Sequence, residues 1–374
     1  MVEMRGAVVR AQHGPFAIER LKLEDPMPGE VLVRIAGVGM CHTDLVVRDQ
    51  YFPTPLPALL GHEGSGVVER VGAGVTKVKP GDHVVMSYAS CGQCANCQRG
   101  LYGYCIDLYG RNFSGGRPDG TSPCCDTDGK RVSAWFFGQS SFAEYALAGE
   151  RNVVKIPDDV PLELMGPLGC GVQTGAGAVM NALKPEGGTS IAIFGAGSVG
   201  LSAVMAAKVI GCAQIVVVDL NPERLALARE LGATHVVNAG SEDPVAAVQA
   251  IAGGEGVQYS LECTGLPKVV RQAVDCLRLT GVCGVIGVAP LGTEMSLDMN
   301  GILFGRTVRG IIEGDSIPDI FIPRLIELWR QGRFPFDRLV RFYPLDEIEA
   351  AAQASEKGDV LKAILLPDPS IRKG

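Results

Sequence analysis

The chain has 374 residues with 34 basic and 41 acidic side chains, which gives a formal net charge of −7. A chain of this length can form two domains, each with a core of its own. The acidic balance and the absence of a basic run exclude nucleic acid and anionic membrane surfaces as expected partners.

The N-terminal segment is charged at Glu3, Arg5 and Arg10, and no apolar stretch follows it. It therefore predicts a cytoplasmic protein without a signal peptide. Two uncharged stretches, 164–183 and 187–207, are as long as a membrane-spanning helix, but glycines and polar residues interrupt both. We expect neither to cross a membrane, and we expect the twelve cysteines to serve metal binding or catalysis rather than disulfides.

Short strands separated by glycine turns fill the first 150 residues. The segments EVLVRIAGVG (30–39), SGVVERVG (65–72) and DHVVMS (82–87) are apolar or alternate between apolar and polar residues. Pro-Gly or Gly-Asp pairs bound them. This pattern is typical of a small β-barrel or sandwich.

From about Thr189, strands alternate with helices. Apolar runs of strand length cover 190–197, 214–220, 234–239, 257–265 and 281–289, and helical patterns lie between them at 199–211, 222–232, after Asp243 and at 266–279. This alternation predicts βαβ units around a parallel sheet that is covered on both faces. Beyond the segment 306–314 we expect helices near 317–330 and 346–357 and a final strand at 361–367.

Gly195, Gly197 and Gly200 have G-x-G-x-x-G spacing between a predicted strand and a predicted helix. Here the first glycine allows a tight turn, the second lets a pyrophosphate approach the backbone, and the third allows close helix–strand packing. Asp219 ends the next strand, where its carboxylate can bind the ribose hydroxyls and would repel a 2′-phosphate. The motif therefore predicts NAD rather than NADP. The alternative is a glycine-rich turn in an α/β domain without a nucleotide.

A cysteine cluster follows the predicted strands of the first part. Cys91, Cys94, Cys97 and Cys105 have C-x2-C-x2-C-x7-C spacing. Four thiolates can surround one Zn(II) tetrahedrally and leave no open position, so we predict a structural zinc site. An iron–sulfur cluster and a metal-free group of buried or redox-active thiols are the alternatives.

Cys41, His62 and Cys170 form a second, dispersed set of donors. Alone, a cysteine is often a small core residue and a histidine is often a satisfied or surface residue. Together, two cysteines and one histidine match the donor set of the catalytic zinc in alcohol dehydrogenase, which leaves the fourth position open.

These motifs resemble those of the zinc-dependent medium-chain alcohol dehydrogenases over nearly the whole chain. The segments that carry the resemblance are GMCHTD, GHEGSGVVERVG, KPGDHV, the four-cysteine lobe, GPLGCGVQTGAG, FGAGSVG and VVVD. HGPF, GQSSFAEYAL, GPLGCGVQTGAG and SIPDIFIPRLIELWRQGRFPFD are most similar to the aryl (benzyl) alcohol dehydrogenase branch. The resemblance implies an α/β protein with a mainly β, GroES-like catalytic domain at 1–171 and 313–374. A Rossmann domain with a doubly wound parallel sheet would occupy 172–312.

The resemblance also implies reversible oxidation of an aromatic primary alcohol to its aldehyde, with hydride transfer to NAD. One of two zinc ions would lie on Cys41, His62 and Cys170, bind the substrate hydroxyl and lower its pKa. Thr43 corresponds to the hydroxyl of the proton relay, and Asp44 would orient His62 through the ring nitrogen that is not on zinc. Glu63 would lie beside the metal, where transient binding and a structural role are both open.

Further positions are assigned by the resemblance alone. In the cofactor site they are His42, which would face the pyrophosphate, and Thr174, Gly195, Gly197, Val199, Gly200, Asp219, Arg224 and Lys362. In the substrate pocket they are Phe52, Phe136, Phe137, Val288 and Ile312. Large apolar side chains suit an aromatic or allylic alcohol, and core packing is the alternative for each of them.

One position departs from the family pattern. Several members carry a histidine three residues after the relay hydroxyl, where this chain has Val46. We therefore expect the relay to end at the ribose hydroxyl or at a water path.

Two other functions stay open at this point. The same scaffold could oxidise aliphatic, terpenoid or thiol-adduct alcohols, or the chain could be a non-catalytic scaffold or redox sensor that binds zinc and a nucleotide. The intact set of Cys41, Thr43, His62 and Cys170 argues against the second. We expect a homodimer or homotetramer that acts on a small-molecule alcohol or aldehyde.

Overall fold

The computed structural model describes residues 1–368, which form two compact units. Unit 1 contains Met1–Cys170, Ile317–Pro323 and the C-terminal part from Asp337, and unit 2 contains Gly171–Ser316 and Arg324–Phe336. The predicted division assigns residues 171, 313–316 and 324–336 to the catalytic domain, whereas these residues lie in unit 2 here. Among the described residues, no helix is long and apolar enough to cross a membrane.

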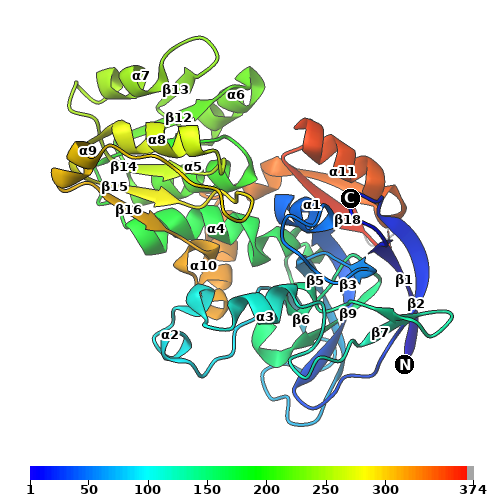
Figure 1. Cartoon of the computed structure of the whole chain (residues 1–374). Coiled ribbons are helices and arrows are strands. Elements are labelled where there is room, and N and C mark those ends of the chain that lie inside the picture. Colours follow the sequence, from blue (N-terminus) through cyan, green and yellow to red (C-terminus); the bar gives the residue numbers. More distant parts are fainter. Residues whose placement is uncertain (369–374) are drawn as a thin grey trace. The chain divides into compact units, whose positions relative to one another are not determined.

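Unit 1 is built on two sheets of mainly antiparallel strands (Figure 1). The five-stranded sheet has the order β4 (Ala58–Leu59), β1 (Val2–Val9), β2 (Ala17–Leu23), β7 (Cys124–Asp126) and β8 (Arg131–Val132). The larger sheet has the order β10 (Val153–Lys155), β6 (His83–Met86), β5 (Glu63–Val71), β3 (Glu30–Gly39), β18 (Lys362–Leu366) and β17 (Val340–Pro344), and β9 (Tyr145–Gly149) also pairs with β3. The strands predicted within 30–39, 65–72 and 82–87 are confirmed as β3, β5 and β6.

The C-terminal strand β18 lies against the strand that leads into the candidate site. It pairs antiparallel with β3, with Ile364 opposite Gly39 and Leu365 opposite Val38. Since β3 ends two residues before Cys41, this pairing brings the start of β18 next to the first donor of the dispersed set. Lys362 and Met40, which are 322 positions apart in the chain, therefore lie in contact.

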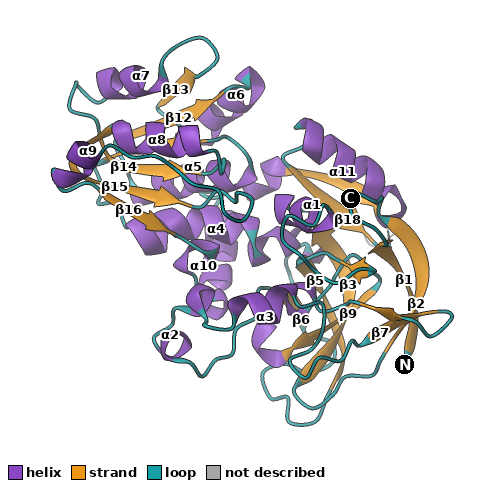
Figure 2. Ribbon diagram, viewed as in Figure 1, coloured by secondary structure: helices purple, strands orange, loops and turns teal. Residues whose placement is uncertain are grey.

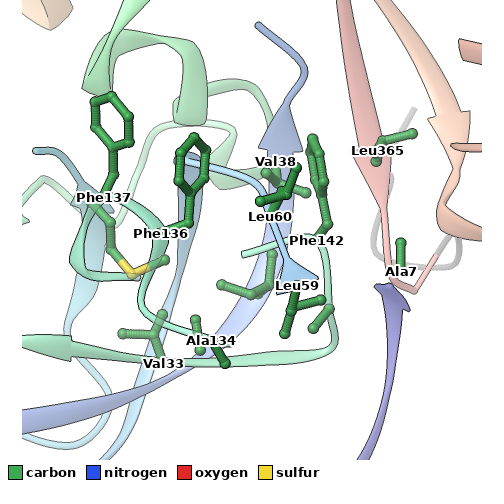
Figure 3. Packing of buried hydrophobic residues seen from close by; sticks show 14 of the residues in the cluster. Ala7, Val33, Val38, Leu59, Leu60, Ala134, Phe136, Phe137, Phe142 and Leu365 are labelled. Carbon is green, nitrogen blue, oxygen red and sulfur yellow. The ribbon is translucent and has the colours of Figure 1, made fainter. Parts of the chain in front are cut away.

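One hydrophobic core fills unit 1. Its inward-facing side chains are almost fully buried, and they include Ala7, Val33, Val38, Leu59, Leu60, Ala134, Phe136, Phe142 and Leu365. Figure 3 shows Phe136 and Phe137 beside each other at one end of this cluster. Burial of the strand side chains supplies most of the driving force that fixes these strands in place.

The helices are short in unit 1 and more regular in unit 2 (Figure 2). Those of unit 1 are α1 (His42–Arg48), α2 (Ala95–Gln98), α3 (Leu108–Phe113) and α11 (Ile348–Lys357), and α10 (Pro318–Arg330) begins in unit 1 and ends in unit 2. Tighter 3-10 turns cover Tyr102–Tyr104, Phe136–Gly138, Glu150–Asn152, Leu162–Leu164, Gly166–Gly169, Glu313–Asp315, Phe336–Leu339 and Leu345–Glu347, and Ala178–Leu183 is a π-helix. The helices predicted near 317–330 and 346–357 are confirmed as α10 and α11.

Unit 2 is a Rossmann fold with a six-stranded parallel sheet. The strand order is β13 (His235–Asn238), β12 (Gln214–Asp219), β11 (Ser190–Phe194), β14 (Val257–Glu262), β15 (Leu277–Val285) and β16 (Thr307–Gly310). The helices are α4 (Gly171–Gly177), α5 (Ser198–Ile210), α6 (Pro222–Leu231), α7 (Pro244–Ile251), α8 (Pro267–Asp275) and α9 (Met299–Leu303). The direction of winding reverses between β11 and β14, and at such a point the carboxyl ends of the strands open a crevice for a nucleotide.

Local signals begin the helices of unit 2 where the sequence pattern predicts them. The side chain of Asn221 accepts hydrogen bonds from the backbone N–H groups of Glu223 and Arg224, and Pro222 opens α6. Asp243 caps α7 in the same way through the N–H of Ala246. Because these caps satisfy N–H groups that no helical carbonyl can reach, they fix where each helix starts.

Candidate active site

Asp44 organises the dispersed donor set. Its side chain is fully buried, and one carboxylate oxygen, Oδ2, accepts a hydrogen bond from the backbone N–H of Cys41 at 2.9 Å. The other, Oδ1, lies 2.9 Å from Nδ1 of His62 and 3.1 Å from the backbone nitrogen of Gly61. Asp44 therefore fixes the His62 ring with Nε2 left for another partner, and holds the backbone of two segments that carry donors.

The donor atoms of Cys41, His62, Glu63 and Cys170 all lie within 4.8 Å of one another. Nε2 of His62 is buried and has no hydrogen-bond partner among the residues that the structure describes. A buried polar atom without a partner is costly, and a metal ion at this point would satisfy it. Two sulfurs, one imidazole nitrogen and an adjacent carboxylate fit zinc in a site with an open position.

The electrostatics of this set favour metal binding. Interactions with Cys170 and His62, together with the charge of Lys362, hold the pKa of the Cys41 thiol well below its ordinary value despite burial. Burial alone would lower the pKa of His62, but the charge and hydrogen bond of Asp44 raise it well above its usual range. Since zinc binds the thiolate form of cysteine, Cys41 is already poised to act as a ligand.

Cys170 reaches the set through close packing of the backbone before it. The hydroxyl of Ser87 donates a hydrogen bond to the carbonyl of Gly169 at 2.7 Å. A Cβ atom at Gly169 would lie only 2.1 Å from the carbonyl oxygen of Met86. The glycine before Cys170 is therefore required for the close approach to β6, and this approach delivers the thiol.

Lys362 lies beside the donor set and is almost fully buried. Its Nζ is 2.8 Å from each carboxylate oxygen of Glu63 and 3.2 Å from the carbonyl oxygen of Met40. Burial opposes its charge, but the Glu63 carboxylate raises the pKa of Lys362 above its ordinary value. The lysine thus binds Glu63 in this structure, and its predicted contact with the cofactor phosphates stays a prediction.

The four clustered cysteines form a separate group. The sulfur atoms of Cys91, Cys94, Cys97 and Cys105 lie within 4.8 Å of one another. Backbone N–H groups of Cys97 and Ile106 lower the pKa of Cys94 to about 6, while burial raises the pKa of Cys97 to about 12. All twelve cysteines are free thiols. The group is complete without a histidine or a carboxylate, as a closed structural zinc site requires.

The glycine motif has the geometry that a dinucleotide needs. Gly195 has φ +100°, and a Cβ atom at Gly200 would lie 1.8 Å from the carbonyl oxygen of Gly195. A Cβ at Gly197 would meet no atom within 4 Å, so this side of the loop is open. The Asp219 carboxylate accepts hydrogen bonds from the N–H of Ala196 at 2.6 Å and of Asn221 at 2.8 Å.

Aromatic rings surround one side of His62. The ring of Phe137 stacks on the imidazole with centroids 4.4 Å apart, and the ring of Phe136 meets it edge-on at 5.2 Å. Phe113, which the sequence analysis missed, contacts both of these rings and also Phe52, at centroid distances of 5.3 to 5.9 Å. No local sequence pattern distinguishes Phe113 from other aromatic residues in helices. Only the tertiary packing places it against Phe52, Phe136 and Phe137.

The remaining predicted residues are divided between the two units. Thr43 is half-buried in α1 with Oγ1 3.7 Å from Sγ of Cys41, and His42 is exposed at the start of that helix. Val288 and Ile312 belong to unit 2 and are 39% and 41% exposed. Thr174, Val199 and Arg224 are also in unit 2, where the hydroxyl of Thr174 is 3.3 Å from a carboxylate oxygen of Glu313.

Val46 lies one turn after Thr43 in α1 and is half-buried. We expect Val46→His to raise the rate of alcohol oxidation below about pH 8 by roughly tenfold, because an imidazole with a pKa near 6.5 could take the proton from the relay that is predicted to begin at Thr43. The measurement is the pH profile of kcat/KM. Val46→Asn, which is polar but does not titrate, is the control, and an unaltered profile for the histidine variant would contradict the expectation.

Two families match separate parts of the chain. Residues 27–158 match the alcohol dehydrogenase GroES-like domain, and residues 198–329 match the zinc-binding dehydrogenase family. Geraniol dehydrogenase of Castellaniella defragrans is 47% identical over 98% of each chain. The crystal structure of benzyl alcohol dehydrogenase from Acinetobacter calcoaceticus has a TM-score of 0.95, with 49% identity over 98% of this chain and 99% of that one. An alcohol dehydrogenase zinc-binding domain protein from Burkholderia ambifaria has a TM-score of 0.96, with 54% identity over 98% of this chain and 100% of that one.

Proposed function

The chain belongs to the zinc-dependent medium-chain alcohol dehydrogenases, and we propose that it oxidises aromatic, benzyl-type primary alcohols reversibly to aldehydes with NAD. The single observation that carries the aryl assignment is the group of phenyl rings around the candidate ligand His62. The oxidoreductase class follows from the family, because both matching families are dehydrogenases and a relative 47% identical is one.

Two zinc ions per chain are part of the proposal. The group of four cysteines would hold a structural ion, and Cys41, His62 and Cys170 would hold the catalytic ion. The catalytic ion would supply Lewis-acid chemistry at the substrate oxygen, and NAD would take up the hydride. Two observations support this assignment. Nε2 of His62 is buried without a hydrogen-bond partner among the described residues, and the pKa of the Cys41 thiol is lowered.

The protein groups have separate tasks in this reaction. Asp44 keeps Nε2 of His62 directed into the donor set by holding Nδ1. Thr43 would take the proton of the substrate hydroxyl at Oγ1 and pass its own proton on. Glu63 is held next to the donors by Lys362. His42 and Lys362 are proposed to face the pyrophosphate.

NAD is proposed as the cofactor because of Asp219. Its carboxylate stands at the end of β12 and is tied to the glycine loop by the N–H of Ala196. A fixed negative charge at this place favours ribose hydroxyls over a 2′-phosphate. Thr174, Val199 and Arg224 are proposed as further contacts of the cofactor, with Gly195, Gly197 and Gly200 around the pyrophosphate.

The ring cluster favours an aromatic substrate. Phe52, Phe113, Phe136 and Phe137 contact one another edge to face, and a benzyl ring could extend such a set with similar contacts. Val288 and Ile312 are proposed to add apolar contacts. The second candidate is an allylic terpenoid alcohol, which the similarity to a geraniol dehydrogenase favours. No feature of residues 1–368 favours a non-catalytic scaffold. A homodimer or homotetramer is proposed from the family resemblance alone.

A panel of substrates tests the aryl assignment. We expect kcat/KM for benzyl alcohol to exceed that for ethanol by about 100-fold or more, since burial of a phenyl ring contributes ~3 kcal/mol. Geraniol, and formaldehyde with glutathione, complete the panel, and cyclohexylmethanol controls for size without aromaticity. A higher kcat/KM for ethanol than for benzyl alcohol would remove the aryl assignment, and a higher value for geraniol would establish the second candidate.

A further inference from the structure

We propose that Gln139 is a positioning residue whose side-chain amide fixes the backbone of His62 and ties it to the aromatic segment 136–138. The inference rests on the proposed function, because it takes His62 as a ligand of the catalytic zinc. Gln139 is only 1% exposed.

The amide of Gln139 pairs with the backbone on both sides of Glu63. Its Nε2 donates a hydrogen bond to the carbonyl of His62 at 2.9 Å, and its Oε1 accepts one from the N–H of Gly64 at 3.1 Å. In an extended strand these two backbone groups point to the same side. The side chain therefore makes the two contacts that a neighbouring strand would make.

A strand is missing at this point, which explains why the amide is needed. β6 pairs with β5 at Ser65, Gly66 and Val67, and it ends at Met86. Beyond that end, Gln139 continues the pairing toward His62 and also lies 3.4 Å, through Nε2, from the carbonyl oxygen of Ser87. The side chain thus extends the sheet by one step, up to the residue that presents the imidazole.

Gln139 stands in a turn with a rare backbone conformation. Phe137 and Ser140 have φ of 52° and 53°, values that residues with a side chain seldom adopt. The hydroxyl of Ser140 accepts a hydrogen bond from the N–H of Phe136 at 2.8 Å and donates to the carbonyl of Leu59 at 2.6 Å. Asn152 donates to the carbonyl of Phe137 at 3.3 Å. These contacts fix the turn so that the ring of Phe137 lies on His62.

His62 is consequently held from three directions. Asp44 holds Nδ1, Phe137 covers one face of the ring, and Gln139 holds the carbonyl group. Without the amide, the carbonyl of His62 and the N–H of Gly64 lose these partners in the interior, and the backbone must shift to find others. A shift of this backbone moves Nε2 relative to the two sulfurs.

The test replaces Gln139 in the purified, metal-loaded protein after exchange of zinc for cobalt. Gln139→Met keeps the length of the side chain and removes both hydrogen bonds. We expect cobalt to leave the Cys41, His62 and Cys170 set about tenfold faster in the presence of a chelator, and its visible absorption bands to shift. Cobalt at the four-cysteine group should leave at the wild-type rate.

Two further variants separate positioning from general destabilisation. Ser65→Ala, also in β5, removes a buried hydroxyl that donates to the carbonyl of Leu162 at 2.7 Å and lies 3.2 Å from that of Gly37, and it should leave cobalt release unchanged. Gln139→Glu keeps the side-chain length and an oxygen that can accept the N–H of Gly64, and it should release cobalt more slowly than Gln139→Met. Release from Gln139→Met at the wild-type rate, or equal acceleration in Ser65→Ala, would overturn the role of Gln139. A wild-type protein that binds cobalt only at the four cysteines would overturn the proposed function instead.

Discussion

Replacement of His62 by alanine is expected to lower kcat/KM for alcohol oxidation by about 1,000-fold or more. The variant removes one of three donors and leaves Cys41 and Cys170 alone, so the site loses its ion at ordinary zinc concentrations. The interaction between a metal ion and the reacting oxygen stabilises the transition state by several kcal/mol, which corresponds to this factor. Steady-state kinetics and the zinc content per chain, expected to fall from two to one, are the measurements.

Two controls make this expectation specific. His235→Ala removes a histidine of β13 in unit 2 and should preserve both zinc ions and the activity. Cys94→Ser, in the four-cysteine group, should lower the thermal stability, because structural zinc contributes to folding. Its effect on kcat/KM should be smaller than that of His62→Ala. If the His62 variant retained two zinc ions and full activity, the assignment of the catalytic ligand set would be wrong.

Asp219→Asn is expected to lower the ratio of kcat/KM for NAD to that for NADP by about 100-fold. Hydrogen bonds to a charged acceptor contribute ~1.5–3 kcal/mol each, and a neutral amide would lose part of this binding energy toward the ribose hydroxyls of NAD. The amide would also no longer repel the 2′-phosphate of NADP. The amide oxygen can still accept one N–H from the glycine loop, so the fold of the loop should persist. Parallel kinetics with the two cofactors give the ratio.

Asp243→Asn is a matched control for this experiment. Asp243 is also a carboxylate of unit 2 that accepts a backbone N–H, from Ala246 at 2.9 Å, but it caps α7 and has no predicted role at the cofactor. Asp243→Asn should change the free energy of unfolding only slightly. It should leave the ratio of kcat/KM for NAD to that for NADP unchanged. A ratio unaffected by Asp219→Asn would show that cofactor preference is decided elsewhere.

The sequence alone predicted the elements whose residues are close together in the chain. The alternation of apolar runs and helical patterns after Thr189 identified the strands and helices of unit 2, because each depends on a local period and on local caps such as Asn221. The spacing of Gly195, Gly197 and Gly200 was likewise enough to predict a tight turn between strand and helix. These features need no information about distant residues.

The candidate site was predictable in part. The resemblance to a family supplied Cys41, His62 and Cys170, and the structure brings their donor atoms together. The role of Asp44 toward His62 was also expected from the resemblance, and the ring nitrogen lies 2.9 Å from its carboxylate. The contact of the same carboxylate with the N–H of Cys41 was not expected, although it is local, because Cys41 is the N-cap residue of α1 and Asp44 is the third residue of that helix.

Tertiary structure decided what surrounds these donors. Gln139 reaches His62 only because β6 ends at Met86 and leaves backbone groups of β5 without a partner strand. Lys362 meets Glu63 because β18 pairs with β3, and Phe113 meets Phe136 because a separate segment folds back onto the turn. The sequence by itself determined the local periods, the caps and the ligand types, because those depend on neighbours in the chain. Apart from the local contact of Asp44 with Cys41, the contacts that position the ligands join segments that are distant in the chain, and only packing sets them.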